Sequence, residues 1–458
     1  MNVYLSISQC YSFKRQPNEA EWDILQSYTR RIWHILGYAN PDGWLDNDSL
    51  IAICSPPVTD PLFPNLRSLY WQGITMIPAM YIAVPSLTSL YLNFTLGHVP
   101  ALKDFLDSIG ALCPNIKQLR IYIPRPHPFD ETIRSHIRRQ TNLQAFDCRG
   151  VILDADTISH LSKISTLTHL SFRLVLDVFD WIPSSGSAFV FSSLARLDIK
   201  SKSLESVMGL LSCTRLPVVE HLGVDFLGCP SKETFGSYIT TVRNTCPSHP
   251  LTSFEIRGMK PPIIFGGIYS ESPHRLTLDD IGPCMAFSNL LHLNINLPWS
   301  VDLTDSDLLA LVSTWPHVHT LLINNEWGWR TTGGITLHGL LQLLQKRRSL
   351  STLCVAIHTE SYTHLPHEVE TGFLPQPGPL MIDLADSPIQ PADVPALVEV
   401  FVKLGLFTHF FSAWDGLNME VLEGAMVYKR AWNQVFDQVM EKFPGPRERN
   451  SVADGESG

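Results

Sequence analysis

The chain has 458 residues, of which 45% are hydrophobic and 17% are charged, and it carries a formal charge of −10 at pH 7. This composition is typical of a globular protein with a large core, and the acidic balance argues against general nucleic-acid binding. The nine cysteines include no CxxC pair, the start lacks a signal-peptide layout, and no apolar run is long enough to cross a membrane. We therefore expect a cytoplasmic or nuclear protein that does not enter a membrane.

A short apolar pattern recurs along most of the chain. It begins with a small residue or proline and has apolar residues at its third, sixth and eighth positions, most clearly in Pro64–Trp71, Pro85–Leu92 and Pro114–Ile121. Neighbouring copies begin 21 to 39 residues apart, and this spacing is centred near the period of a leucine-rich repeat. The first apolar positions of the copies are Leu66, Leu87, Ile116, Leu143, Leu167, Leu194, Val219, Leu251, Leu290, Val318 and Leu350.

Each copy of the pattern predicts a short strand whose alternate side chains point into the core. One such strand cannot bury its apolar side chains alone, so parallel copies are expected to stack. An additional strand is expected at Ile32–Leu36. The apolar spacing between strands predicts helices at Pro100–Ile109, Asp154–Leu161, Ser203–Leu211, Lys232–Val242, Asp305–Val312 and Ile335–Arg347.

The predicted fold is an α/β leucine-rich-repeat solenoid, or horseshoe, of about eleven to twelve irregular strand-helix repeats. The alternative, a doubly wound α/β enzyme, requires longer apolar strands and a glycine-rich phosphate turn, and the sequence contains neither. Two Pro- and Gly-rich stretches, Arg257–Cys284 and His358–Leu380, are expected to be long surface loops. The predicted domains are an N-terminal flank or cap (1–30), the solenoid (31–423), a C-terminal capping helix (424–443) and a disordered tail (444–458).

The segment Leu112–Ile121 resembles the cysteine-containing leucine-rich repeat of F-box proteins. The wider layout is similar to the F-box/leucine-rich-repeat family of mushroom-forming (basidiomycete) fungi over about residues 12–415. The other segments that carry the resemblance are Glu21–Asp23, Tyr28–Ile32, Leu62–Leu69, Leu216–Leu222 and Phe411–Trp414.

The resemblance implies a substrate-recognition part of an SCF-type ubiquitin ligase. In that family a helical F-box precedes the Glu-Trp segment. Only 20 residues precede Glu21 here, and none match an F-box. We therefore expect the F-box to be missing from this chain, and a Skp-type adaptor and a cullin are expected as partners only if an F-box lies upstream.

The sequence contains no nucleophile elbow, phosphate-binding loop, zinc-protease motif or calcium-binding loop. The histidine pairs His364/His367 and His317/His319 lack the further ligands that a zinc site needs. No catalytic, cofactor-binding or metal-binding residue is therefore predicted.

Cysteines and acidic residues near the strands and helix starts have structural explanations. Cys113 and Cys148 lie at or beside predicted strands, where they are expected to fill the core. Asp154 and Asp305 stand where helices begin and are expected to act as N-caps.

The residues between the inward-pointing ones are predicted to lie on the concave face, which is expected to continue to Asn296 and Asn324. From Arg120 to Lys200 these positions carry five basic and two acidic residues. Tyrosine and arginine dominate interface hot spots, and arginine binds carboxylates with two parallel hydrogen bonds. The alternative is that a solvated strand face is polar in any case. The predicted partner-binding residues are Tyr70, Tyr91, Arg120, Tyr122, Arg149, Arg173, Arg196 and Lys200.

The sequence therefore predicts a non-enzymatic protein-binding module, monomeric and without a cofactor, that binds a protein partner on its concave face. One alternative is a scaffold or decoy repeat protein unrelated to ubiquitination. A second is an α/β hydrolase or transferase.

Overall fold

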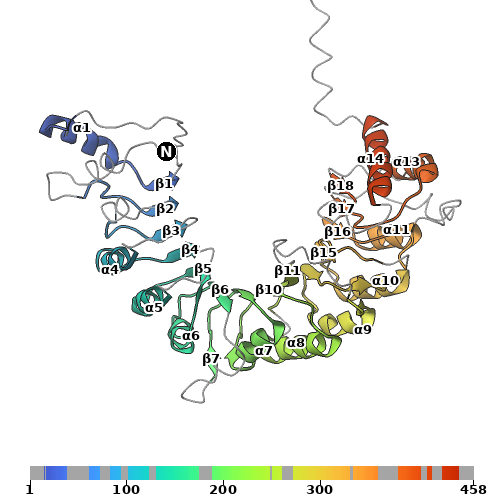
Figure 1. Ribbon diagram of the computed structural model, residues 1–458, viewed down its shortest axis with the longest axis horizontal. Coiled ribbons are helices and arrows are strands. Elements are labelled where there is room, and N and C mark those ends of the chain that lie inside the picture. The colour runs from blue at the N-terminus through green and yellow to red at the C-terminus, as the bar shows by residue number, and fades with distance from the viewer. Residues whose placement is uncertain are drawn as a thin grey trace, which may run out of the picture. The chain divides into compact units, whose positions relative to one another are not determined.

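The computed structural model of the chain describes residue 15 and residues 17–38, 61–72, 83–93, 102–122, 130–174, 188–247, 250–259, 272–330, 334–358, 380–403, 410–414 and 425–442. The chain divides into two compact units, Met1–Val219 (unit 1) and Glu220–Gly458 (unit 2). In both units parallel strands alternate with helices (Figure 1).

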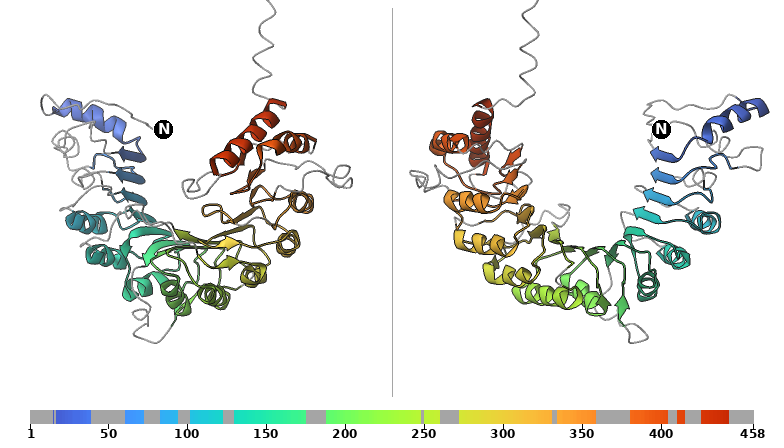
Figure 2. Two further views of the ribbon diagram at one scale, coloured as in Figure 1. Left: turned by 45° about the vertical axis from the view of Figure 1, so that its right-hand side comes forward. Right: turned by 180° about the vertical axis from the view of Figure 1, so that it is seen from behind.

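Unit 1 contains a parallel sheet with its helices on one side (Figures 1 and 2). The sheet order is β1-β2-β3-β4-β5-β6-β8, which is also the chain order, and β7 pairs with β9 in a separate two-stranded sheet. Its elements are α1 (Glu19–Thr29), β1 (His34–Tyr38), β2 (Ser68–Gln72), β3 (Ser89–Asn93), α4 (Leu102–Leu112), β4 (Gln118–Tyr122), α5 (Asp130–Arg139), β5 (Ala145–Ile152), α6 (Ala155–Ser162), β6 (His169–Leu174), β7 (Phe189–Val190), β8 (Arg196–Ser201), α7 (Leu204–Ser212) and β9 (Thr214–Arg215).

Unit 2 repeats the same arrangement. Its parallel sheet has the order β10-β11-β13-β15-β16-β17-β18, and β12 pairs with β14. Its elements are β10 (His221–Leu227), α8 (Lys232–Thr245), β11 (Ser253–Met259), β12 (Arg275–Leu276), α9 (Leu278–Ile281), the 3-10 helix η3 (Gly282–Ala286), β13 (His292–Asn296), β14 (Ser300–Val301), α10 (Asp305–Thr314), β15 (Thr320–Ile323), α11 (Leu337–Lys346), β16 (Thr352–Cys354), β17 (Met381–Asp383), the 3-10 helix η4 (Pro391–Asp393), α13 (Val394–Lys403), β18 (Phe410–Ser412) and α14 (Ala425–Lys442).

The core of each unit is a row of apolar side chains that are register partners on consecutive strands. In unit 1 the row is Leu69, Leu90, Leu119, Phe146, Leu170 and Leu197, and each is at most 3% exposed. In unit 2 it is Leu222, Phe254, Leu293, Leu321, Leu353 and Ile382, all fully buried. Because the pattern repeats in phase with the strands, stacking joins these side chains into one core per unit. The predicted α/β leucine-rich-repeat solenoid is therefore confirmed.

The predicted element boundaries differ from the structure by a few residues. The first strand begins at His34, two residues after the predicted start. The helix expected from Pro100 begins at Leu102, and Pro100 itself lies outside the described residues. Along the described ranges no helix combines the length and the apolar character that crossing a bilayer requires.

Asp154 is the N-cap of α6, as predicted, and its carboxylate accepts a hydrogen bond of 2.9 Å from the Thr157 N–H. The prediction for Asp305 is wrong, because the N-cap of α10 is Thr304. Asp305 instead accepts hydrogen bonds from the Thr336 N–H (2.8 Å) and hydroxyl (2.7 Å) at the start of α11. A local pattern cannot show this role, because the two residues belong to different repeats.

The prediction of a long loop at 257–284 is wrong for the residues of this segment that the structure describes. Strand β11 continues to Met259, and β12, α9 and η3 lie between Arg275 and Ala286. Leu276, Ile281 and Cys284 are fully buried. The segment therefore packs against the core through these apolar side chains and does not form a surface loop. Residues 260–271, the predicted loop interior 359–379 and the tail 444–458 lie outside the described residues.

Candidate protein-binding face

The side chains that alternate with the core row of unit 1 lie on the opposite side of the sheet from the helices. We name this surface the strand face of unit 1. Its central row consists of the register partners Tyr70, Tyr91, Arg120, Asp147, Ser171 and Asp198, one from each of β2, β3, β4, β5, β6 and β8. The structure thus brings three of the predicted partner-binding residues, Tyr70, Tyr91 and Arg120, onto adjacent strands in one row.

Tyr70 and Tyr91 form an aromatic stack at one end of the central row. Their ring centroids are 4.2 Å apart and their planes differ by 7°. The Tyr70 hydroxyl donates a hydrogen bond of 3.2 Å to the Gln72 side-chain carbonyl. Burial, together with the neighbouring Tyr70, raises the pKa of Tyr91 above its ordinary value. Both rings are partly exposed, so the stack presents a rigid aromatic surface that is still accessible to a partner.

Gln72 accepts the hydrogen bond that orients Tyr70, but it was not among the residues predicted from the sequence. The signal was present, because residues two apart in a strand point to the same face.

Arg173 and Lys200 are register partners on β6 and β8 at the other end of the strand face. Both side chains are partly exposed. Neither forms an ion pair or a hydrogen bond with any side chain in the described ranges of the chain. Two adjacent cations without a carboxylate between them repel each other, and an anionic group placed there would relieve the repulsion.

Arg196 differs from these two residues because it is already paired. Its Nε lies 2.8 Å from Oδ2 of Asp198, two residues along the same strand. Both side chains point to the same face, so the period of the strand itself produces the pair. Arg196 therefore has less free charge to offer a partner than the sequence suggests.

Tyr122 and Arg149 complete the predicted set. Tyr122 is register partner to Asn93 and is 44% exposed, which leaves its ring accessible. Arg149 lies in β5, where the register shifts between Cys148 and Ile152, so that Arg173 has Ile152 as its partner instead of Arg149. The side chain of Arg149 lies outside the described residues. The regular basic ladder expected from Arg120 through Arg149 to Arg173 is therefore interrupted in register at β5.

The corresponding face of unit 2 has a different chemistry. Arg257 pairs with Asp225 at 2.8 Å, and the electrostatic influence of Glu255 and Glu326 also reaches Arg257. His221 shares a hydrogen bond of 2.8 Å with Ser253. Arg257 thus has carboxylates around it, whereas Arg173 and Lys200 on the strand face of unit 1 have no carboxylate paired with them among the described residues.

Asn296 and Asn324 do not lie on an exposed face, which corrects the sequence prediction, because both are fully buried. Asn324 has a φ of 53° after β15, a left-handed conformation that asparagine tolerates. Its side chain accepts a hydrogen bond from the Leu297 N–H (2.8 Å) and donates one to the Trp299 carbonyl (2.7 Å). The residue closes a turn between repeats.

The buried thiols of Cys113, Cys246 and Cys284 lack the environment of a nucleophile. Burial raises the pKa of Cys113 to about 11 and those of Cys246 and Cys284 to about 12, whereas a reactive thiol needs a lowered pKa. Cys113 and Cys148 are fully buried, which confirms their predicted place in the core. In the described ranges, three or more potential metal ligands are nowhere grouped as a metal site would require. His317 and His319 lie within those ranges, while His364 and His367 lie outside them.

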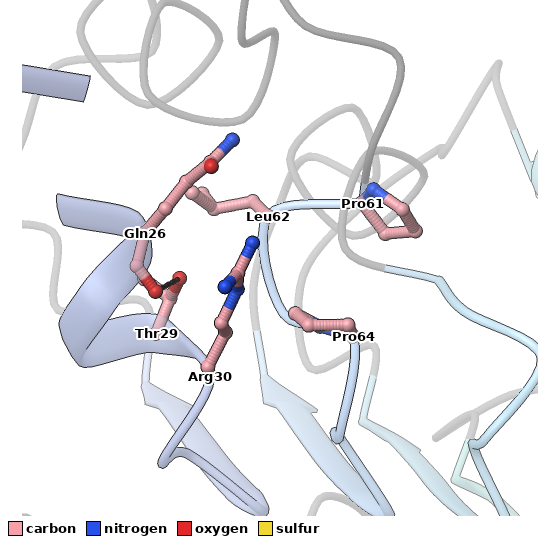
Figure 3. Close-up of a pocket in the computed structure, with 6 residues that line it drawn as sticks. All are labelled: Gln26, Thr29, Arg30, Pro61, Leu62 and Pro64. Carbon is pink, nitrogen blue, oxygen red and sulfur yellow. Dashed lines mark hydrogen bonds between the residues drawn. The ribbon is translucent and has the colours of Figure 1, made fainter. Parts of the chain in front are cut away.

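A small cavity of about 240 Å³ lies beside α1 (Figure 3). It is lined by Gln26, Thr29, Arg30, Pro61, Leu62 and Pro64. These six side chains include no carboxylate, imidazole or thiol, so no acid or base in the lining can activate the Thr29 hydroxyl.

No protein-family model matches the chain, and no curated protein does. Among solved structures it is similar to the yeast Rad7 and Elc1 complex, with 14% identity, a TM-score of 0.35 and coverage of 70% of this chain and 76% of that one. It is also similar to the plant peptide hormone receptor RGFR1 in complex with RGF2 (14% identity, TM-score 0.30, 76% of this chain and 51% of that one). A third is the functional domain of InlJ from Listeria monocytogenes (12% identity, TM-score 0.29, 72% and 67%). Likenesses this distant do not indicate what the chain binds, which has to be inferred from its own residues.

Proposed function

We propose that this chain is a non-enzymatic protein-binding module whose partner docks on the strand face of unit 1. The observation that carries the proposal is the Tyr70–Tyr91 stack followed in the same row by Arg120. Aromatic rings held by neighbouring strands offer contact area at a low entropic cost, and tyrosine and arginine dominate binding energy at protein interfaces.

The rigidity of the sheet supports this proposal. Tyr70, Tyr91 and Arg120 extend from strands whose adjacent residues, Leu69, Leu90 and Leu119, are buried in the core. The backbone under the tyrosines is therefore fixed before a partner arrives. A preorganised surface of this kind loses little conformational entropy on binding.

The resemblance to F-box/leucine-rich-repeat proteins suggests a finer proposal, in which the partner is a substrate of an SCF-type ubiquitin ligase. A Skp-type adaptor and a cullin would then associate only through an F-box. Without one, the module would hold its partner as a scaffold or decoy. The cytoplasmic or nuclear location expected from the sequence suits both versions.

The test is affinity purification of the wild-type chain from cells beside two variants, with quantitative mass spectrometry. Tyr70→Ala/Tyr91→Ala removes the stack, and Tyr28→Ala removes an exposed ring on α1 as a control. We expect at least one protein to be retained by the wild type and the control and lost from the stack variant. That protein is then produced pure, and its affinity is measured by calorimetry.

If every captured protein binds all three chains equally, the strand face of unit 1 is not the binding surface. Recovery of a Skp-type adaptor and a cullin would support the ubiquitin-ligase version. Their absence beside a specifically enriched partner would favour the scaffold or decoy version.

A further inference from the structure

Arg173 and Lys200 indicate which chemical class of partner the strand face of unit 1 can bind, whereas the tyrosine stack alone does not. They are partly exposed neighbours on β6 and β8, and no carboxylate among the described residues pairs with either of them. The nearby Asp198 is engaged with Arg196 at 2.8 Å. The positive charge at this end of the strand face is therefore available to a ligand.

We infer that the strand face of unit 1 binds an extended acidic protein segment, with Asp or Glu side chains at Arg173 and Lys200 and an apolar or aromatic side chain against the Tyr70–Tyr91 stack. The inference rests on the proposed function and adds the chemical class of the partner. Charge complementarity selects this occupant, because two adjacent cations favour a carboxylate and disfavour a basic segment.

The geometry also predicts a spacing within the partner. Three strand spacings of about 4.8 Å separate Tyr91 from Arg173, with a further step of about 6.6 Å along the strand. The direct path is roughly 16 Å, which an extended chain covers in about five residues. The apolar residue and the first acidic residue of the partner should therefore stand about five positions apart.

The same charges could be thought to attract nucleic acid instead. The central row contains Asp147 and Asp198 between and beside the cations, and both would repel a phosphate backbone. The whole chain carries a formal charge of −10, which further disfavours a polyanion. The acidic side chains of the proposed segment contact Arg173 and Lys200, which lie outside the central row, and only its apolar side chain lies on that row, at the Tyr70–Tyr91 stack.

The test uses the full chain immobilised as a target for random peptides of about a dozen residues displayed on phage. We expect the selected peptides to be enriched in Asp or Glu, with an apolar or aromatic residue about five positions away. The best peptide is then synthesised with a fluorescent label, and its affinity is measured by anisotropy. Arg173→Glu/Lys200→Glu should weaken binding at least tenfold, and added salt should weaken binding to the wild type.

Lys163→Glu/Arg215→Glu is the matched control. It makes the same change of charge at two exposed positions outside the strand face, namely the C-cap of α6 and β9. It should bind the peptide within about twofold of wild type. Circular dichroism melts show whether each variant is folded. If Arg173→Glu/Lys200→Glu is not, the neutral Arg173→Gln/Lys200→Gln replaces it, with an expected loss in the same direction.

Each other outcome contradicts a distinct statement. If Tyr70→Ala/Tyr91→Ala abolishes binding and the Arg173/Lys200 variants do not, the acidic-segment inference is wrong and the proposed function stands. If the selected peptides bind all variants equally, or if none is selected, the acidic-segment inference is wrong, and the affinity purification with the Tyr70→Ala/Tyr91→Ala variant decides the proposed function. If labelled poly(dT) binds more tightly than the best peptide and loses affinity in Arg173→Glu/Lys200→Glu, the site is one for nucleic acid and the inference is overturned.

Discussion

The carboxylate of Asp386 accepts a hydrogen bond of 2.6 Å from the backbone N–H of Trp329, 57 residues earlier in the chain. Its second oxygen accepts one of 2.7 Å from the Arg330 N–H. Arg330 and Gly328 both have positive φ values, 54° and 75°, so the turn that presents these N–H groups is one that few sequences adopt unaided. The buried carboxylate supplies the partners that this turn lacks.

Replacing Asp386 with Ala should therefore destabilise the protein by about 2–4 kcal/mol, because the buried N–H of Trp329 and the partly buried N–H of Arg330 lose their acceptor. The check is urea unfolding followed by fluorescence. Asp437→Ala, at an exposed position on α14, should change the free energy of unfolding by less than about 0.5 kcal/mol. Equal stability of the two variants would show that Asp386 does not hold the turn.

Two helical glycines should respond oppositely to alanine. A methyl group at Gly339 in α11 would overlap the Asp305 carboxylate, which is held by its two hydrogen bonds to Thr336. Gly339→Ala should therefore cost about 1–3 kcal/mol. At Gly236 in α8, open space surrounds the position that an added methyl group would take, so Gly236→Ala should stabilise by about 0.5–1 kcal/mol. Melting temperatures that shift in the same direction would contradict the role of Asp305.

His136 should make stability depend on pH. Burial lowers its pKa to about 4 from 6.5, so at pH 5 the unfolded chain binds a proton there and the folded chain does not. The stability contributed by neutral His136 is therefore complete above pH 6.5 and is lost as the pH falls toward 4. The loss should be on the order of 3 kcal/mol.

The measurement for His136 is the urea midpoint between pH 7 and pH 4.5 for the wild type, His136→Gln and His317→Gln. Since His317 is exposed, its variant should follow the wild-type pH dependence. His136→Gln should show a shallower decline. Parallel curves for all three proteins would mean that His136 has the same pKa in the folded and the unfolded chain, which would contradict the prediction.

The core row of unit 1 can be tested with two leucine-to-alanine variants in the same repeat, one buried and one exposed. Leu119→Ala should cost about 2–5 kcal/mol, because Leu119 is fully buried and its removal leaves a cavity. Leu112→Ala, seven positions earlier at the end of α4, removes the same atoms from a side chain that is 44% exposed. It should change stability by less than about 0.5 kcal/mol. A small effect at Leu119 would contradict its place in the core row.

The amino-acid pattern was sufficient to predict the fold, because alternate residues of a strand point to the same side of the sheet. This holds for each repeat separately and does not depend on which strand lies next to it. Leu69, Leu119 and Leu321 could be placed in the core, and Tyr70 and Tyr91 opposite it, from a period of two alone. The N-cap Asp154 was equally predictable, since its hydrogen bond to Thr157 is local.

The contacts between repeats depend on the tertiary structure. The repeats differ in length, so the sequence pattern does not show which residues of neighbouring strands become register partners. The bulge in β5 moves Arg149 out of line with Arg173, and the paired register of β6 and β8 places Arg173 beside Lys200. The link from Asp305 to Thr336 likewise depends on how α10 and α11 stack. Sequence determines which face each side chain occupies, whereas packing determines which charges meet there.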